Sequence, residues 1–426
     1  MRLRGGARPA AAPVRVRFDG QEIEALPGES IAATLAAAGI VAVRSARSGA
    51  PRGPFCGMGV CFDCLVSVDG RPSQRACLTK IEAGMDVRSQ PSPRNVAAEP
   101  PAPTREESCD VLVVGAGPAG LTAARDLARA GARTIVLDER LDPGGQYFKP
   151  LAASQASAAM PDRQFRAGAT LRREAADSGA EIVTGATVWA AFGAGEIAAI
   201  VGGDSTLFRP RRLLLATGAY EQAAPIPGWT LPGVMTVGGL QGLARSYRVA
   251  PGQRIVIAGN GPLCLQTAVE LLDGGAEIAA VVEAAPRPGL AQWRDLLRSG
   301  LAAPSLMLDG ARLVRKLEHA GVPILWGDRA ITILGSERAE GLQTRSRRID
   351  ADIVALGYGF ASSSELARAR MRASLRRAWC WQHGDRRRCR WPHLDSRGLR
   401  HRRRRPLRWR PCRAGRGYDR RGRNRQ

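Results

Sequence analysis

The strongest constraint on this chain lies in residues 110–120, which read DVLVVGAGPAG. An apolar strand runs into three glycines with G-x-G-x-x-G spacing and then into a helical stretch. In this pattern Gly115 makes a tight turn, Gly117 lets a pyrophosphate approach the backbone, and Gly120 lets helix and strand pack closely. The N-terminus of the helix presents its positive dipole end to the phosphates. The motif therefore predicts a βαβ unit that binds a dinucleotide.

The next strand, TIVLDER, ends in Asp138 and Glu139, about 20 residues beyond the glycine turn. In dinucleotide sites an acidic residue at this place binds the ribose hydroxyls. Asp138 has the better spacing to the following Gly144-Gly145 pair, so we expect Asp138 to bind the adenosine ribose, with Glu139 as the alternative. Strand, helix and acidic strand end together argue against an ordinary glycine-rich turn.

Two later segments continue the same architecture. LLLATGAYE at 213–221 places Thr217 and Gly218 at the end of another strand, where the chain passes the flavin a second time in oxidoreductases with two dinucleotide sites; the alternative is an ordinary strand-to-loop turn. RIVIAGNG at 254–261 then restarts the glycine pattern.

In this second turn Gly259 and Gly261 are present, but Cys264 replaces the third glycine, and the following strand ends at Glu283. The cysteine makes helix–strand packing less close without forbidding the fold. We expect a second Rossmann domain, which either binds NAD(P) or another nucleotide or serves as a scaffold.

Four cysteines near the N-terminus are spaced C-x4-C-x2-C-x12-C: Cys56, Cys61, Cys64 and Cys77. The first two gaps are those of plant-type [2Fe–2S] ferredoxins, whose thiolates hold two irons. Glycines within CGMGVCFDC permit the tight backbone that directs N–H groups at the sulfurs. Zinc and buried structural thiols are the alternatives, but zinc sites favour paired short C-x2-4-C spacings, of which only one occurs here. We expect a [2Fe–2S] cluster.

The remaining chemistry-bearing side chains are few. Cys109 and Cys264 are expected to be small core residues. No further C-x-x-C lies near the flavin segments, and His319, the one histidine in residues 1–365, is expected on a helix surface. The sequence therefore offers redox cofactors without evident acid–base machinery, and no catalytic residue is predicted.

The net charge of +24 is concentrated at one end of the chain. Residues 366–426 carry 23 arginines against three acidic residues, which leaves 40 basic and 36 acidic residues in the first 365.

The longest apolar run, Ile31–Val43, is shorter than the roughly 18 residues of a membrane helix and is expected to form a buried helix. Residues 1–13 lack the apolar stretch of a secretory signal. We therefore expect a cytoplasmic enzyme that does not associate with membranes.

These features divide the chain into segments. We predict an α/β protein with a β-grasp [2Fe–2S] ferredoxin-like domain, a Pro-rich linker, a flavin domain interrupted by an NAD(P)-like Rossmann domain, and an Arg-rich tail. The predicted boundaries are 14–90, 91–108, 109–235, 236–348, 349–366 for the return to the flavin domain, and 367–426.

Several segments together resemble one family: RGPFCGMGVCFDCLVSVDG, RACLTKI, VVGAGPAGLTAARDLARAGARTIVLDE, PGGQYFKP, LLLATGAYE and IPGWTLPGVMTVGGLQ. The resemblance covers roughly residues 14–366 and is to the ferredoxin-fused FAD-dependent oxidoreductases related to the alpha subunits of opine oxidase, hydroxyproline dehydrogenase and hydrogen cyanide synthase, and more distantly of sarcosine oxidase. It implies FAD, bound by Gly115, Gly117, Gly120, Asp138/Glu139, Gly145, Gln146, Thr217 and Gly218, and a cluster on the four cysteines.

The same resemblance implies a division of labour between subunits. A separate beta subunit with its own flavin would oxidise an amine or imino acid, and this alpha subunit would handle the electrons. The alternative enzyme is an NAD(P)H-dependent ferredoxin-type reductase.

The tail departs from this family. A closing strand of the form G-V-Y-A-x-G-D is expected after Glu365, but GLRHRRRR stands at 398–405. Codons exist for these eight residues that read V-Y-A-T-G-D-G from the second base, and an arginine surge is typical of GC-rich DNA read out of frame. We expect a frameshift near residues 367–371 and a disordered tail. The alternatives are a truncated, non-functional remnant and a basic arm that binds nucleic acid, which is the weaker hypothesis.

Overall fold

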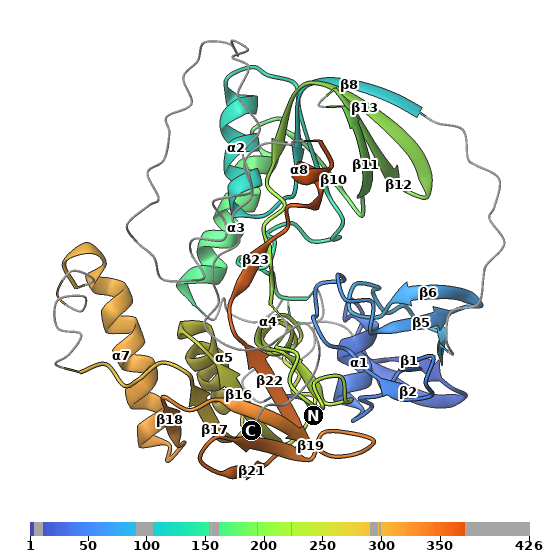
Figure 1. The fold of residues 1–426 in the computed structure, drawn as a ribbon. Helices are drawn as coiled ribbons and strands as arrows, with labels where there is room; N and C mark the ends of the chain where they lie inside the picture. Colours follow the sequence, from blue (N-terminus) through green and yellow to red (C-terminus); the bar gives the residue numbers. More distant parts are fainter. Residues whose placement is uncertain are drawn as a thin grey trace, which may run out of the picture. The chain divides into compact units, whose positions relative to one another are not determined.

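The computed structural model describes residues 1–3, 12–90, 105–152, 155, 162–193, 195–222, 224–289, 297 and 300–370. The chain divides into two units, Met1–Ala373 and Ser374–Gln426, and the described residues all belong to the first. The predicted Arg-rich tail, including the proposed out-of-frame motif, lies from residue 371 onward outside the described residues. Figure 1 shows the elements of the first unit in sequence colours.

The cluster-binding domain is a five-stranded sheet with one helix on it, in the strand order β2-β1-β7-β5-β6. Its elements are β1 (Val14–Phe18), β2 (Gln21–Ala25), α1 (Ile31–Ala37), β3 (Arg44–Ser45), β4 (Pro51–Arg52), β5 (Leu65–Val68), β6 (Arg71–Arg75) and β7 (Asp86–Ser89). The parallel pairing of β1 with β7, flanked by the antiparallel pairs β1–β2 and β5–β6, is the β-grasp arrangement predicted.

Local sequence explains the ends of these elements. Asp19 and Gly20 both have positive φ, which is the geometry of the two-residue hairpin turn between β1 and β2. The hydroxyl of Ser30 accepts a hydrogen bond from the Ala33 N–H at 3.2 Å and caps α1. The helix is fully packed against the sheet but stops before Gly39, whose φ is +80°. The buried helix expected over Ile31–Val43 is therefore confirmed only in its first half.

The flavin domain contains a six-stranded sheet in the order β10-β9-β8-β13-β12-β11, of which the first four strands are parallel. Its elements are β8 (Arg105–Val114), α2 (Pro118–Arg129), β9 (Thr134–Asp138), α3 (Arg163–Ala176), β10 (Glu181–Thr184), β11 (Thr187–Gly193), β12 (Glu196–Val201) and β13 (Asp204–Leu215). Strand β8 begins inside the predicted linker, because residues 105–109 pair with β13.

Both faces of this sheet are covered, which explains why β8 and β9 read as continuous apolar runs. Leu112 and Leu137 point to the face over which β11 and β12, the far strands of the same sheet, fold back. Val113 and Val136 point to the other side, where they pack against Leu121 of α2. The strand ends that carry the glycine turn are thereby fixed between two cores.

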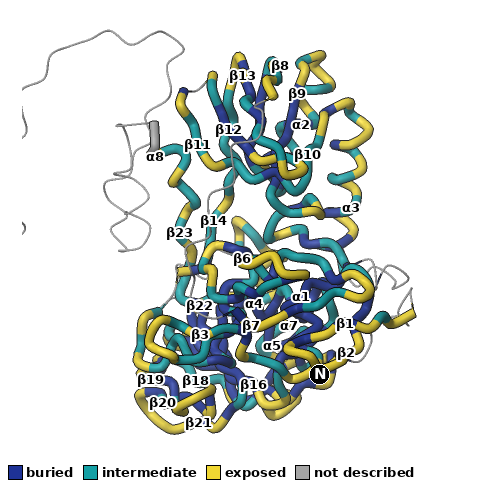
Figure 2. The backbone as a smooth tube through the Cα atoms, turned by 90° about the vertical axis from the view of Figure 1, so that its right-hand side faces the viewer, coloured by how far each residue is buried: buried dark blue, intermediate teal, exposed yellow. Residues whose placement is uncertain are grey.

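The second Rossmann domain has a parallel sheet in the order β15-β22-β16-β17-β18. Its elements are β15 (Val234–Thr236), α4 (Val237–Gly242), the π-helix η2 (Leu243–Tyr247), β16 (Arg254–Gly259), α5 (Pro262–Asp273), β17 (Glu277–Glu283), α7 (Pro304–His319), β18 (Ile324–Trp326), β19 (Ala330–Leu334), β20 (Gly341–Thr344), β21 (Arg348–Asp350) and β22 (Ile353–Gly357). Figure 2 shows buried backbone concentrated around α4, α5 and β16.

One predicted boundary differs from the structure. Residue 349 was expected to begin the return to the flavin domain, but β22 lies between β15 and β16 in the second sheet. Its five residues, IVALG, are all buried there. The return starts later, with β23 (Phe360–Ser362), which pairs with β14 (Ala219–Glu221), and continues into α8 (Glu365–Arg370). A short buried strand carries no sequence mark of which sheet it joins, and this caused the error.

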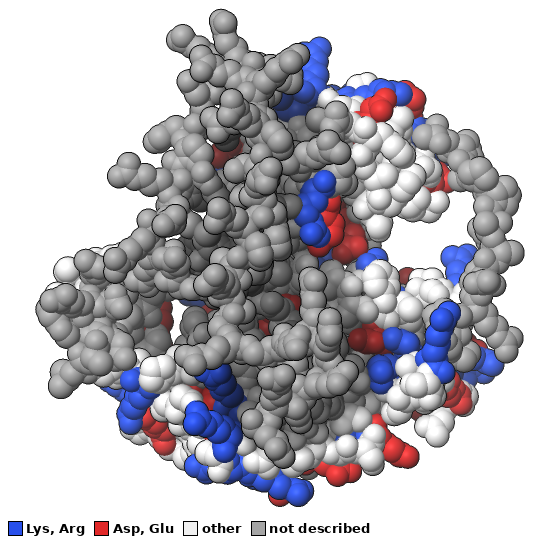
Figure 3. Space-filling model, in the orientation of Figure 1, with Lys and Arg blue, Asp and Glu red and all other residues white. Residues whose placement is uncertain are grey.

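Charged side chains of both signs are interspersed over the described face in Figure 3. No helix among the described residues is long and apolar enough to span a membrane.

Candidate cofactor sites

The first glycine turn joins β8 to α2 with the geometry that the motif predicts. Gly115 has a φ of +105°, and a Cβ there would lie 2.4 Å from the carbonyl oxygen of Ala216. A Cβ on Gly120 would lie 1.8 Å from the carbonyl oxygen of Gly115, so only glycine lets the helix approach the strand. Gly117 is the N-cap of α2 and has no neighbour within 3.9 Å of its Cβ position. The turn is therefore tight at two glycines and open at the third, as a phosphate-binding turn requires.

Asp138 holds this turn in shape. One carboxylate oxygen accepts a hydrogen bond from the Ala116 N–H at 2.6 Å, and the other accepts one from the Arg140 N–H at 2.8 Å. Glu139 lies differently: its carboxylate forms a 3.1 Å ion pair with Arg75 of the cluster-binding domain. Asp138 thus braces the glycine turn, and its contact with a ribose stays a prediction.

A second glycine pair lies against the first turn. The Gly144 N–H donates to the carbonyl oxygen of Ala116 at 2.8 Å, and Gly145 has a φ of +63°. A Cβ on Gly145 would lie 2.8 Å from the Cα of Gly117, so the two backbones approach closely. Gln146 follows in the same loop and is half-buried. The structure therefore brings Gly145 beside the turn at which a pyrophosphate is expected.

The A-T-G segment also lies beside this turn, because Gly115 packs on Ala216. The Thr217 hydroxyl donates to the carbonyl oxygen of Ser363 at 2.6 Å, and the Ser363 N–H donates to the Gly218 oxygen at 3.0 Å. Thr217 and Gly218 are thereby linked to the strand that returns from the second domain.

The second glycine turn repeats the design of the first. Glu283, 3 % exposed at the end of β17, accepts the Gly261 N–H on one oxygen and the Ala285 N–H on the other, both at 2.9 Å. Gly261 has a φ of +102° with open space at its Cβ position, whereas a Cβ on Gly259 would lie 2.1 Å from the Gly357 oxygen. The predicted residues Gly259, Gly261 and Glu283 therefore form a second, separate turn.

Cys264 occupies the place of the third glycine in this turn. Its thiol lies 3.9 Å from the Gly357 oxygen, and burial raises its pKa to about 12. Cys109, a residue of β8, is likewise buried in the core, and burial raises its pKa to about 11. Both cysteines are core residues, as expected. His319 lies exposed at the end of α7, also as expected.

The four N-terminal cysteines meet in one loop region of the β-grasp domain. The Cys61 and Cys77 thiols hydrogen-bond to the Cys56 sulfur, and Cys77 also contacts Cys64. Backbone N–H groups of Met58 and Asp63 point at the sulfurs of Cys56 and Cys61, at 3.4 and 3.5 Å. Gly57, Gly59 and Phe62 supply the left-handed backbone conformations that this loop needs.

These contacts bring the four sulfur atoms close together. Hydrogen bonds from the Cys61 and Cys77 thiols lower the pKa of Cys56 well below its usual range, whereas donation to Cys56 raises the pKa of Cys61 and Cys77. Among the described residues no three His, Cys, Asp or Glu side chains surround a single ion position. A two-iron cluster does not need one, because its four thiolates divide between two irons. The four cysteines therefore fit a [2Fe–2S] cluster.

The cluster loop packs against the second Rossmann domain. The Thr236 N–H donates to the Phe55 oxygen at 3.0 Å, and the rings of Phe55 and Trp229 meet edge to face at 5.5 Å. A Cβ on Gly57 would lie 2.8 Å from the Cα of Gly239 in α4, so the two backbones touch there.

The sequence analysis did not identify two buried charged residues, Lys149 and Glu221, that bond to the backbone of Gly238 in α4. Lys149 is 9 % exposed, and its amine donates to the Gly238 oxygen at 3.1 Å; burial lowers its pKa to about 7. Glu221 is also buried, accepts the Gly238 N–H at 2.5 Å, and has its pKa raised by burial. The one sequence signal for this buried pair was the position of the lysine in PGGQYFKP, close after the Gly144-Gly145 pair.

Comparisons with known proteins give the family. Residues 11–92 match the 2Fe-2S iron-sulfur cluster binding domain. Residues 109–379, more than half of the chain, match the pyridine nucleotide-disulphide oxidoreductases. The chain belongs to the pyridine nucleotide-disulphide oxidoreductase family. Its first domain implies a [2Fe–2S] cluster, and the family implies FAD, with NAD(P) compatible with the second turn. The resemblance drawn from the sequence is thereby confirmed at the level of domains.

Curated relatives are named as subunits of larger enzymes. The chain is 34% identical over 281 residues to the A subunit of opine oxidase from Rhizobium meliloti, which covers 62% of this chain and 52% of that protein. It is 32% identical over 271 residues to the HcnB subunit of hydrogen cyanide synthase from Pseudomonas aeruginosa, covering 60% and 58%. The chain spans a little over half the length of these relatives.

A solved structure, L-proline dehydrogenase from P. horikoshii, matches with a TM-score of 0.60 at 19% identity. The match covers 84% of this chain and 63% of that chain. At this identity the likeness concerns the fold.

Proposed function

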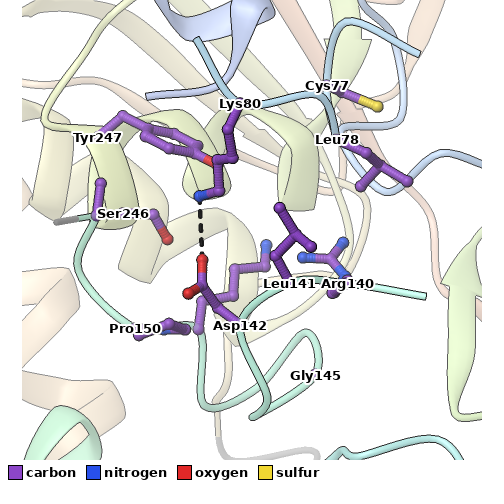
Figure 4. A pocket seen from close by; sticks show the side chains of 12 residues that line it. Cys77, Leu78, Lys80, Arg140, Leu141, Asp142, Gly145, Pro150, Ser246 and Tyr247 are labelled. Carbon is purple, nitrogen blue, oxygen red and sulfur yellow. Dashed lines mark ion pairs between the residues drawn. The ribbon is translucent and has the colours of Figure 1, made fainter. Parts of the chain in front are cut away.

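We propose that this chain is the electron-transfer subunit of a heteromeric amine or imino-acid dehydrogenase. One observation carries the proposal: Cys77, a cluster ligand, and Gly145, of the flavin turn, line the same pocket (Figure 4). Cofactors at these two places would be close enough to exchange electrons. FAD can take up two electrons together and release them singly to a [2Fe–2S] cluster, and this is the chemistry that the bound groups supply.

The residues of the chain would position these groups. Gly117 and Gly145 would bring backbone N–H groups to the pyrophosphate, whereas Gly115, whose own N–H donates to the Leu137 oxygen at 2.7 Å, makes the turn. Asp138 keeps the turn in shape. The four cysteines hold the irons, and N–H groups aimed at their sulfurs stabilise the added negative charge of the reduced cluster.

The partner is proposed to be a beta subunit that oxidises the substrate with its own flavin. The names of the relatives support a partner subunit, because both are parts of assemblies. The proposed substrate class is amines and imino acids with proline-like or opine-like structure. The name of opine oxidase supports the opine-like part, and the resemblance to hydroxyproline dehydrogenase supports the proline-like part. We also propose a cytoplasmic location, since cluster thiolates suit a reducing compartment.

A second candidate function is NAD(P)H-dependent reduction of the cluster. The observation that favours it is the second glycine turn, where Gly261 leaves open space at the N-terminus of α5 and Glu283 braces the loop. Reduction of the flavin by NADH or NADPH in the isolated chain would support this function over the first.

The cluster assignment is tested with Cys61→Ser, beside Cys109→Ser as a matched control. We expect the first change to abolish the visible absorption of the cluster and the EPR signal of its reduced form, and the second to leave both intact. Stoichiometric zinc without acid-labile sulfide in the wild-type protein would overturn the assignment.

The division of labour is tested with the purified chain alone. We expect little or no dehydrogenation of proline or opines when the second subunit is missing. Rapid amine oxidation by the isolated chain would contradict the proposed role.

A further inference from the structure

One arginine joins the loop of the cluster cysteines to the flavin domain. Arg75 ends β6, and its side chain is 23 % exposed. Its Nη1 atom donates to the Gly59 oxygen at 3.2 Å and to a carboxylate oxygen of Glu139 at 3.1 Å. Gly59 lies between Cys56 and Cys61 in the chain, whereas Glu139 directly follows β9. A single guanidinium group therefore contacts both cofactor-binding parts of the chain.

The backbone of Arg75 holds the turn that carries the fourth cysteine, Cys77. The Arg75 oxygen accepts hydrogen bonds from the N–H groups of Leu78 and Thr79, at 2.9 and 3.0 Å. It also accepts one from the Thr79 hydroxyl at 3.0 Å. These bonds do not involve the guanidinium group. A substitution of the side chain can therefore remove the guanidinium contacts and leave this turn in place.

The loop that Arg75 contacts contains a strained residue. Phe62 has a φ of +58°, and this left-handed conformation is costly for a bulky side chain. From it the N–H of the next residue, Asp63, points at the Cys61 sulfur at 3.5 Å. The Phe62 ring is exposed, and the Arg75 guanidinium lies over it, 5.8 Å from its centroid. This cation–π contact and the bond to Gly59 help to hold the strained conformation.

The two ion pairs beside the loop differ in where their carboxylates lie. Arg44 pairs with Asp63 at 2.7 Å, so both of these charges belong to the cluster-binding domain. The carboxylate that pairs with Arg75 is that of Glu139, in the flavin domain. The positive end of this second pair therefore contacts the cysteine loop, and its negative end lies beyond the loop.

We propose that Arg75 is a positioning residue, which holds the cysteine loop on the end of β9 and whose charge favours reduction of the cluster. Reduction adds one electron to the cluster, and the added negative charge is stabilised by a nearby cation and destabilised by a nearby carboxylate. Arg75 and Glu139 therefore shift the cluster potential in opposite directions, and Arg75 has the larger effect because it contacts the loop.

The effect on the cluster rests on the proposed function, whereas the hold on the loop does not. In that function the electron comes from the reduced flavin, which is oxidised and releases its proton to the solvent. In the test below the electron comes from dithionite. The cluster gains one electron in both cases, and no bond to a protein atom forms or breaks.

The charge effect is tested by redox titration of the full-length protein with dithionite, followed by EPR of the reduced cluster. We expect Arg75→Gln to disfavour reduction about threefold to tenfold, which lowers the midpoint potential by about 30–60 mV at about 59 mV per tenfold. Glu139→Gln should raise the potential by a smaller amount. Arg75→Lys keeps the charge and should change the equilibrium less than about twofold.

Arg71→Gln is the matched control for this titration. Arg71 is exposed at the other end of β6, and the substitution makes the same change in net charge. We expect it to leave the potential unchanged. Structural damage has no reason to follow the sign of the charge that is removed. A shift of the same sign in Arg75→Gln and Glu139→Gln, or an equal shift in Arg71→Gln, would refute the charge effect.

The hold on the loop is tested by hydrogen exchange of the same variants. We expect the amides of residues 57–64 to exchange about threefold or more faster in Arg75→Gln, because the strained loop opens more often. Arg75→Lys should also exchange faster, since an ammonium group lacks the planar donors of a guanidinium group. Arg71→Gln should exchange like the wild type. Unchanged exchange in Arg75→Gln would refute the positioning role.

The two kinds of failure stay distinguishable. If the wild-type protein contains no cluster, the proposed function fails, and hydrogen exchange still decides whether Arg75 holds the loop. Circular dichroism shows whether each variant folds. If Arg75→Gln does not fold, the upward shift in Glu139→Gln decides the charge effect and the exchange of Arg75→Lys decides the positioning role.

Discussion

Two glycines of the first turn separate what the fold needs from what the cofactor needs. A Cβ on Gly120 would lie 1.8 Å from the Gly115 oxygen, whereas a Cβ on Gly117 would meet nothing closer than the Cα of Gly145 at 3.9 Å. Neither glycine has a positive φ, so backbone strain does not enter. We expect Gly120→Ala to damage the protein itself and Gly117→Ala to damage FAD binding alone.

The magnitudes follow from these contacts. An ordinary contact is about 3.5 Å, so Gly120→Ala must push helix and strand apart by roughly 1.5 Å. Overpacking of this kind costs about 1–3 kcal/mol of unfolding free energy, which corresponds to roughly 5- to 150-fold in FAD affinity if the turn bears the whole cost. Gly117→Ala changes an N-cap and should cost less than about 1 kcal/mol in the FAD-free protein. Its methyl group would occupy the place of the pyrophosphate and weaken FAD binding tenfold or more.

Denaturant unfolding of the FAD-free protein measures the unfolding free energy of each variant. Titration with FAD, followed by the quenching of flavin fluorescence, measures its FAD affinity. Cys264→Ala, at the equivalent position of the second turn, is the matched control and should leave FAD affinity unchanged. If Gly117→Ala bound FAD as tightly as the wild type, the pyrophosphate would not pass this turn. If Gly120→Ala were as stable as the wild type, the packing argument would be wrong.

Three further predictions concern other parts of the chain. Asp138→Asn should lower the unfolding free energy by about 1.5–3 kcal/mol, because it disturbs a charged acceptor of two backbone N–H groups. Glu139→Gln removes only a half-exposed ion pair and should cost less than about 1 kcal/mol. Equal losses for the two variants in urea unfolding would contradict this difference. Lys149 loses its proton near pH 7 in the folded chain and at about 10.5 when unfolded. The unfolded chain then binds more protons between these values, so stability should rise with pH across this window in the wild type and rise less in Lys149→Met; parallel pH profiles would refute it. Finally, the nucleotide sequence should show an insertion or deletion near codon 368, and restoring the other frame should increase FAD occupancy; an intact frame in independently sequenced DNA would end the frameshift hypothesis.

The sequence predicts the local parts of the two nucleotide turns well. Glycines at 115, 117 and 120 have steric and capping roles that depend on a few neighbouring residues, so their pattern is sufficient. The second turn can be interpreted in the same way: because Cys264 replaces the third glycine, the sequence predicts that helix and strand pack less closely there. The cysteine loop is likewise encoded by spacing within a short stretch.

Contacts between distant segments could not be predicted. Nothing in β22 itself indicates that it joins the second sheet between β15 and β16. The bracing of the first turn by both oxygens of Asp138 depends on the exact position of the Ala116 and Arg140 N–H groups. The pocket that Arg140 and Lys149 line also takes residues from 77–80 and 246–247, and no sequence periodicity predicts that these distant segments meet.

The packing of the cluster loop on the second Rossmann domain has a consequence for how the chain is held together. Phe55, Cys56 and Met58 belong to the same apolar core as Val256 and Leu356. This contact works as an interface between two partners that happen to share one polypeptide through residues 91–104. A covalent tether holds such partners at an effective concentration near the millimolar range, so that even a weak interface stays occupied. Cutting one peptide bond in that segment would make the distance between cluster and flavin depend on protein concentration.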